Sequence, residues 1–181
     1  MNQQGSTQKI QLQPFSLENT PDDCQINVLL SNYGSVLKIA FELTSRLVEL
    51  RIPDFNPAKA QRKDNLWEHT CFEIFLGQHG TSGYWEFNLS PSGDWNVYSF
   101  SGYRQEMKPE RSFDTLPFEV KILSEQTFKL ETAIDLKFFQ GFSDINIGLS
   151  AVLERNDGYK SYWASSHPGD TPDFHAREGW L

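Results

Sequence analysis

Short segments in which apolar and polar residues alternate recur along almost the whole chain. They constrain the fold more than any other feature, because alternation with a period of two places apolar side chains on one face of a strand. Glycine, asparagine, aspartate and proline separate the segments at the spacing of hairpin turns. The strands predicted in this way lie at residues 9–15, 25–30, 36–43, 46–52, 66–76, 84–89, 95–100, 118–123, 128–134, 145–153 and 159–163.

Short strands with turn signals between them favour an all-β fold. The expected architecture is a two-sheet antiparallel β-sandwich, jelly-roll or immunoglobulin-like, of about ten strands. The helical pattern is limited to one turn at 135–139, with Asp135 as its N-cap. Because no repeat or linker divides the chain, we expect one domain at residues 8–181 and a disordered tail at 1–7.

Composition and charge exclude several classes of function. The net charge of −8 and the lack of a basic stripe argue against nucleic-acid binding. A polar N-terminus and the absence of a long apolar run predict neither a secretory signal nor a membrane span. Cys24 and Cys71 lack metal-pair spacing, so free thiols, a cytoplasmic location and no metal site are expected.

The central strands combine polar and aromatic side chains on the face that points away from the predicted core. These are Trp67, His69, Glu73, Glu86, Asn88 and Tyr98. Aromatic rings can cover the C–H face of a sugar, while carboxylates and amides hydrogen-bond its hydroxyls. The alternative is a solvated face with cross-strand pairs, and the pattern alone does not decide between the two.

A second group of chemistry-bearing residues lies near the C-terminus. Trp163, His167, Asp173 and His175 are close in sequence there. The histidines are too widely spaced for a typical zinc site, so local hydrogen bonding or ligand contact is expected instead.

Arg104 opens the long connection at 102–116, after an aromatic strand. Its fork-shaped guanidinium could bind an acidic or polyhydroxyl ligand. A salt bridge to Glu68 or Glu73 is the structural alternative.

Catalytic motifs are sparse. No nucleophile with a base, no nucleophile elbow and no phosphate loop is recognisable. Glu73 and Glu86 are the one candidate pair for the two carboxylates that glycoside hydrolysis requires. Cross-strand carboxylates are common in sandwiches, however, so the sequence favours binding over catalysis.

Three segments together resemble the DOMON-like proteins and are similar to family 9 carbohydrate-binding modules. They are residues 62–75 (RKDNLWEHTCFEIF), 84–98 (YWEFNLSPSGDWNVY) and 162–175 (YWASSHPGDTPDFH). The resemblance implies a β-sandwich that clamps a terminal sugar between aromatic rings, at one sheet or its rim. The ligand-binding residues it suggests are Trp67, Trp95 and Tyr98 as rings and Glu73, Glu86, Asn88 and Arg104 as hydroxyl partners, with His69, Trp163 and His167 nearby.

Other relatives of this kind bind haem through a methionine and a histidine, which implies Met107 and His167 here. Met107 lies in a polar stretch, so a surface methionine is the alternative. We therefore expect a non-catalytic module for a carbohydrate or small polyol. The alternatives are a haem-binding electron-transfer domain, a glycosidase-like hydrolase, and an interaction domain that forms a homo-oligomer.

Overall fold

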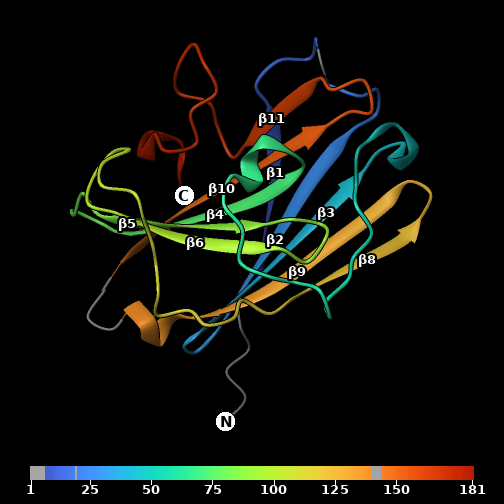
Figure 1. Ribbon diagram of the computed structural model, residues 1–181. Helices are drawn as coiled ribbons and strands as arrows, with labels where there is room; N and C mark the ends of the chain where they lie inside the picture. The colour runs from blue at the N-terminus through green and yellow to red at the C-terminus, as the bar shows by residue number, and fades with distance from the viewer. Residues whose placement is uncertain (1–6, 19, 140–143) are drawn as a thin grey trace.

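The computed structural model describes residues 7–18, 20–139 and 144–181 (Figure 1). The predicted tail covers residues 1–7: residues 1–6 lie outside the described residues, and Thr7 belongs to the first strand. The strands are β1 Thr7–Pro14, β2 Gln25–Tyr33, β3 Val36–Thr44, β4 Cys71–Gln78, β5 Tyr84–Leu89, β6 Trp95–Phe100, β7 Lys108–Pro109, β8 Phe118–Ser124, β9 Thr127–Asp135, β10 Ile145–Glu154 and β11 Lys160–Ala164. Short 3₁₀ turns are Leu47–Glu49, Leu66–Glu68, Leu136–Phe139 and Arg177–Gly179.

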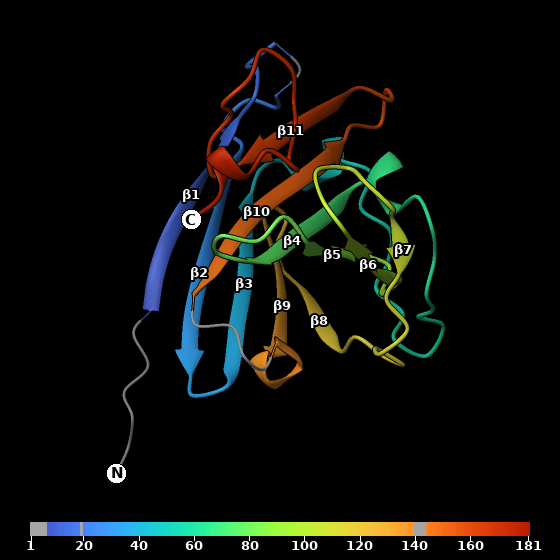
Figure 2. The same ribbon diagram turned by 90° about the vertical axis from the view of Figure 1, so that its left-hand side faces the viewer.

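The strands form one sheet in the order β7-β6-β5-β4-β10-β11-β1-β2-β3-β9-β8, with antiparallel neighbours. The sheet curls strongly, so that its β4 half (β4–β7, β10 and β11) crosses over its β3 half (β1–β3, β8 and β9) (Figure 2). Strand β1 joins the halves, because it pairs with β2 and its last two residues, Gln13 and Pro14, pair with β11. The all-β antiparallel prediction is confirmed. Two separate sheets are not, because β1 makes the sheet continuous.

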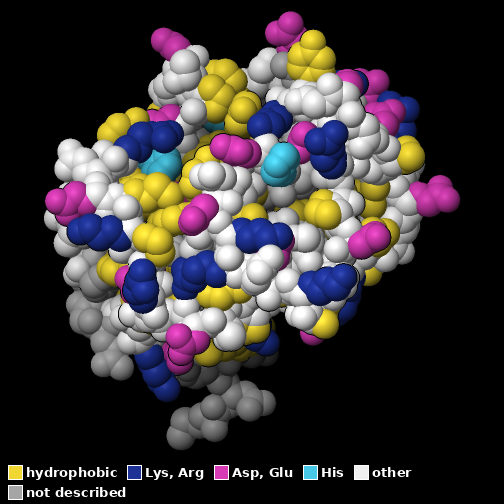
Figure 3. Space-filling view, viewed as in Figure 1, with side chains coloured by type: hydrophobic (Ala, Val, Ile, Leu, Met, Phe, Trp, Pro, Cys, Tyr) yellow, Lys and Arg dark blue, Asp and Glu magenta, His cyan; other side chains and the backbone are white. Residues whose placement is uncertain are grey.

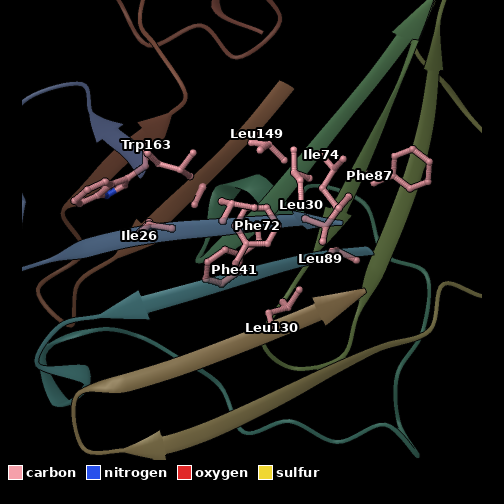
Figure 4. Packing of buried hydrophobic residues seen from close by; sticks show 14 of the residues in the cluster. Ile26, Leu30, Phe41, Phe72, Ile74, Phe87, Leu89, Leu130, Leu149 and Trp163 are labelled. Carbon is pink, nitrogen blue, oxygen red and sulfur yellow. The ribbon is translucent and has the colours of Figure 1, made fainter. Parts of the chain in front are cut away.

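The main hydrophobic core fills the space between the two halves (Figure 4). Phe72 and Phe87 point inward from the β4 half and Phe41 and Leu130 from the β3 half. The ring of Phe72 stacks on Phe128 at 5.3 Å between centroids and packs on Phe41 at 5.2 Å. Burial of such rings is the main favourable contribution to the folding of this sheet.

One predicted strand is wrong and another begins later than predicted. Residues 46–52 contain the 3₁₀ turn Leu47–Glu49 and only a single bridge, between Leu50 and Arg155. The strand predicted from residue 66 begins at Cys71, because Asn65 adopts a left-handed conformation (φ 61°) and the chain then makes the turn Leu66–Glu68. By contrast, β5 and β6 have the predicted bounds.

The predicted helical turn is present at Leu136–Phe139. The backbone N–H of Lys137 donates to Oδ1 of Asp135 at 3.0 Å, as expected of an N-terminal cap. No helix in the described part of the chain is long and apolar enough to span a bilayer.

Candidate functional site

The site begins with the outer face of the β4 half, which points away from the main core. Strand pairing places Glu73 opposite Asn88, and Glu86 opposite Phe75 on one side and Tyr98 on the other. Because side chains alternate along a strand, these residues share the outer face while their neighbours enter the core. A second apolar cluster covers this face: Phe75, Tyr84, Tyr98 and Phe100, with Trp67, Phe174 and Trp180 packed against it.

The C-terminal residues 165–181, which we call the strap, cover part of the same face (Figure 1). The guanidinium of Arg177 donates to the backbone carbonyls of Gln78, Thr81 and Gly83, at the β4–β5 turn. The indole of Trp180 lies 5.5 Å from the rings of both Phe75 and Tyr84. The strap is also held by the backbone, because Leu181 and Ile147 of β10 exchange two N–H···O hydrogen bonds, at 2.9 and 3.1 Å.

The strap depends on a close approach at Gly148. A Cβ atom built there would lie 2.6 Å from Nε1 of Trp180. We therefore expect Gly148→Ala to displace Trp180, to lower the free energy of unfolding by about 1–3 kcal/mol, and to speed proteolytic cleavage within the strap.

Limited proteolysis read by mass spectrometry tests this expectation. Gly169→Ala is the matched control in the strap itself, since its nearest neighbour would lie 3.8 Å away. Equal cleavage of the two variants would show that the strap does not depend on the Trp180 contact.

A set of hydrogen bonds ties the strap to the loop after β6. Asp173 accepts from the hydroxyl of Tyr103 at 2.6 Å and from Nη2 of Arg104 at 2.9 Å. Arg104 holds a left-handed conformation (φ 53°) in this loop. Its ion-pair partner is therefore Asp173, and the expected salt bridge to Glu68 or Glu73 is wrong.

A cavity of about 440 Å³ lies between the outer face of the sheet, the strap and this loop. Four rings contribute to its walls: Trp67, Phe100, Tyr162 and Phe174. Glu73 and Glu86 reach it from the sheet, although they are only 2% and 4% exposed. The molecular face in Figure 3 shows hydrophobic side chains interspersed with acidic, basic and histidine side chains.

The two buried carboxyl groups influence each other's charge. Burial raises the pKa of Glu86 to about 7, although the hydrogen bond from Asn88 and the charge of Arg104 both act to lower this pKa. Burial, and next the charge of Glu86, raises the pKa of Glu73 well above its usual value, while Ser150 and Arg104 act in the opposite direction. Near neutral pH the pair therefore retains at least part of its protons.

His175 contacts Glu86 from the strap. Its Nδ1 lies 2.7 Å from the hydroxyl of Tyr84, which also accepts from the backbone N–H of Arg104. The hydroxyl of Tyr84 can therefore donate its hydrogen bond to Nδ1 of His175, so the neutral imidazole carries its proton on Nε2, the atom that faces Glu86. Burial, followed by the charge of Arg104, lowers the pKa of His175 to about 4, so the 3.8 Å contact between Nε2 and Glu86 is not an ion pair at neutral pH.

The structure brings four of the predicted ligand-binding residues to the cavity: Trp67, Glu73, Glu86 and Arg104. Asn88 and Tyr98 lie behind this lining. Asn88 donates to Oε1 of Glu86 at 2.8 Å, and the Tyr98 ring contacts Trp67 edge-on at 5.7 Å. Both therefore orient residues that line the cavity.

The other four lie elsewhere. Trp95 and Trp163 point into the main core from the opposite face of the sheet. His69 is held by Glu154 through an Nδ1–Oε2 contact of 2.8 Å. His167 donates from Nε2 to the carbonyl of Gln13 at 2.9 Å.

The haem interpretation does not fit the residues that the sequence suggested for it. Met107 lines the cavity and is 43% exposed, whereas His167 is not among the cavity-lining residues. The two residues that ligate a haem iron must both reach the same pocket, and Met107 and His167 do not line the same cavity.

Sequence reasoning missed Phe100, Tyr162 and Phe174 as cavity residues, whereas it placed His175 in the C-terminal group with ligand contact as one expected role. Phe100 could have been found, because alternation places it on the same face as Tyr98. The sequence singled out the 162–175 segment but not its place, since only the fold brings 172–175 against β4 and β5.

The fold and the site together define an antiparallel β protein with a strap-covered cavity on the outer face of its curled sheet. The same fold occurs in a proposed carbohydrate-binding protein from Bacteroides uniformis, which is 14% identical and has a TM-score of 0.62 over 94% of this chain and 84% of that one.

A family 9 carbohydrate-binding module from Caldicellulosiruptor kristjanssonii, solved with glucose, has a TM-score of 0.44 and 14% identity over 85% of this chain and 73% of that one. No protein-family profile and no curated sequence matches this chain. A relationship to DOMON-like proteins stays a prediction.

Proposed function

We propose that the protein binds a small carbohydrate or similar polyol, without chemical conversion, in the cavity beneath the strap. The observation that carries this proposal is the combination of aromatic walls with two buried carboxyl groups in one cavity of about 440 Å³. That volume suits a ligand of one or two sugar rings. The fold shared with the Bacteroides uniformis protein, itself described as carbohydrate-binding, agrees with the proposal.

The lining divides by chemistry in the way that sugar recognition needs. Rings such as Trp67 and Tyr162 offer flat apolar contact to the C–H face of a pyranose. The carboxyl groups of Glu73 and Glu86 accept or donate hydrogen bonds to hydroxyls according to their protonation. Asn88 and Ser150 hold these groups in place, at 2.8 and 3.1 Å, so the hydrogen-bonding atoms are already oriented before a ligand arrives.

Replacing Trp67 by alanine should weaken sugar binding about tenfold, because its indole is one of the four aromatic rings that line the cavity. Titration calorimetry against mono- and disaccharides measures the effect without using the indole as the reporter. Tyr159→Ala is the control, since Tyr159 is an exposed aromatic residue in the β10–β11 turn and does not line the cavity. If no sugar in a broad panel binds the unmodified protein, the proposed function is wrong.

Hydrolysis of a glycoside is a second candidate, and the coupled carboxyl groups are the observation that favours it. A glycosidase needs one protonated and one ionised carboxyl group, and a pair with raised pKa values can supply both near neutral pH. Assay of aryl glycosides tests this candidate. Turnover that disappears in both Glu73→Gln and Glu86→Gln would replace the binding proposal, and no turnover would remove the candidate.

A further inference from the structure

Among the described residues, neither carboxyl group of the cavity forms a salt bridge with a lysine or arginine, although the charge of Arg104 acts on both. Ser150 donates a hydrogen bond to Glu73, Asn88 donates one to Glu86, and neutral His175 approaches Glu86 at 3.8 Å. A buried carboxylate without a cation is costly, whereas a buried pair of acid groups facing a cavity can receive a cation from outside.

The two basic residues of the lining do not fill this role. Arg104 is paired with Asp173 at 2.9 Å, and Asp173 also accepts from Tyr103. Lys160 of β11 pairs with Glu154 of β10. Glu154 lies four residues along β10 from Ser150, which pairs with Glu73 of β4. At the rise of a strand, the backbone of Glu154 lies about 13 Å from that of Ser150, so Lys160 enters the lining from β11 opposite Glu154 and not beside Glu73.

The aromatic rings point to the same kind of ligand. Phe100, Tyr162 and Phe174 approach the cavity in which the acid pair lies. Ring faces attract cations, and a desolvated site strengthens that attraction. A protonated amine would therefore find ring faces and carboxylates in one place, while an anionic sugar would meet like charges.

We propose that the preferred ligand is an amino sugar, whose ammonium group binds Glu73 and Glu86 while its ring lies against the aromatic walls. This inference rests on the proposed carbohydrate-binding function and names the chemical class within it. The ammonium group carries a full positive charge, so it forms an ion pair with an ionised carboxylate that a hydroxyl group at the same position cannot form.

The titratable groups around the acid pair favour this selectivity at neutral pH. They are Glu73, Tyr84, Glu86, Arg104, Asp173 and His175. His175 stays neutral above a pH of about 4, so it does not supply the missing cation. As the pH rises through about 7, Glu86 ionises and the preference for an amine over its neutral parent should increase.

Titration calorimetry with matched pairs tests the inference: D-glucosamine against D-glucose, D-galactosamine against D-galactose, and D-mannosamine against D-mannose, near neutral pH. We expect at least one amino sugar to bind about tenfold more tightly than its parent, which is about 1.4 kcal/mol. Glu73→Gln and Glu86→Gln should remove the preference, whereas Glu119→Gln, on exposed β8, should keep it.

The outcomes separate the inference from the function on which it rests. If the neutral parents bind as tightly as the amino sugars, the amine preference is wrong and carbohydrate binding stands. If neither member of any pair binds, both proposals fail. A preference that persists unchanged in both glutamine variants, with melting curves showing them folded, would place the ammonium group elsewhere and also overturn the inference.

Discussion

Phe72→Ala should lower the free energy of unfolding by about 3–5 kcal/mol, the largest single effect that we expect from the main core. The Phe72 ring is fully buried and contacts Phe41 of β3 and Phe128 of β9 at centroid distances of 5.2 and 5.3 Å. It thus joins the two halves of the curled sheet, where a cavity cannot collapse without moving whole strands. Chemical denaturation monitored by circular dichroism measures the loss.

The matched control is Ile122→Ala on the edge strand β8, where the side chain is 63% exposed. Its substitution should change the free energy of unfolding by about 0.5 kcal/mol or less. A Phe72→Ala variant as stable as the Ile122→Ala variant would mean that the two halves of the sheet do not depend on this contact.

The hairpins could be predicted from sequence because each depends on local information. Alternation and a turn residue determine both strands of a hairpin such as β2–β3, where Gly34 takes a positive φ of 65°. The continuity of the sheet could not be predicted, because it depends on the two-residue pairing between β1 and β11, about 150 residues apart.

Alternation was also the better guide to the site wherever it was followed strictly. It places Trp95 with Val97, on the core side of β6, and Phe100 with Tyr98, on the outer side. The family resemblance instead suggested Trp95 as a ligand ring. In the structure Arg62 covers the Trp95 ring at 4.3 Å and also donates to Asn96 at 2.7 Å, which fixes the 54–65 connection against the sheet.

The segment around Trp67 shows the opposite case. The prediction that Trp67 lies on the same side as Glu73 is correct, although the predicted strand at 66–70 is not. Residues 66–70 alternate as a strand would, but Asn65 turns the chain and Trp67 leaves the sheet. Trp67 still reaches the cavity that contains Glu73, because the Leu66–Glu68 turn lies beside Tyr98. Packing on a neighbouring strand, rather than periodicity, determines its position.

Glu86→Gln should stabilise the protein above pH 7 and leave its stability nearly unchanged at pH 4.5. A group whose pKa is raised in the folded state favours folding at low pH, and that contribution is lost as the pH rises through the folded value. For Glu86 this loss begins near pH 4.5, the ordinary pKa, and is complete above about pH 7, the pKa in the folded protein. The difference between the two pKa values corresponds to a loss of about 3 kcal/mol in the free energy of unfolding. The variant lacks this loss, so its melting temperature above pH 7 should be higher by roughly 10 °C.

The comparison must be made between the two proteins at each pH, because His175 acts in the opposite direction. Its pKa is lowered from 6.5 to about 4, so stability rises with pH over that range and offsets the loss from Glu86 in the unmodified protein. The difference between the variant and the unmodified protein cancels the His175 contribution. A difference that stayed flat with pH would show that Glu86 ionises in the folded state as it does in the unfolded chain.

The same substitution links stability to function. If Glu73 and Glu86 serve to bind an ammonium group, Glu86→Gln should make the protein more stable above pH 7 and at the same time abolish its preference for amino sugars. That opposition is expected where a binding site retains charges that folding alone would disfavour. Melting curves with the amino sugar of the three that binds most tightly, and with its neutral parent, test it directly: the amine should stabilise the unmodified protein and shift the variant no more than the parent does.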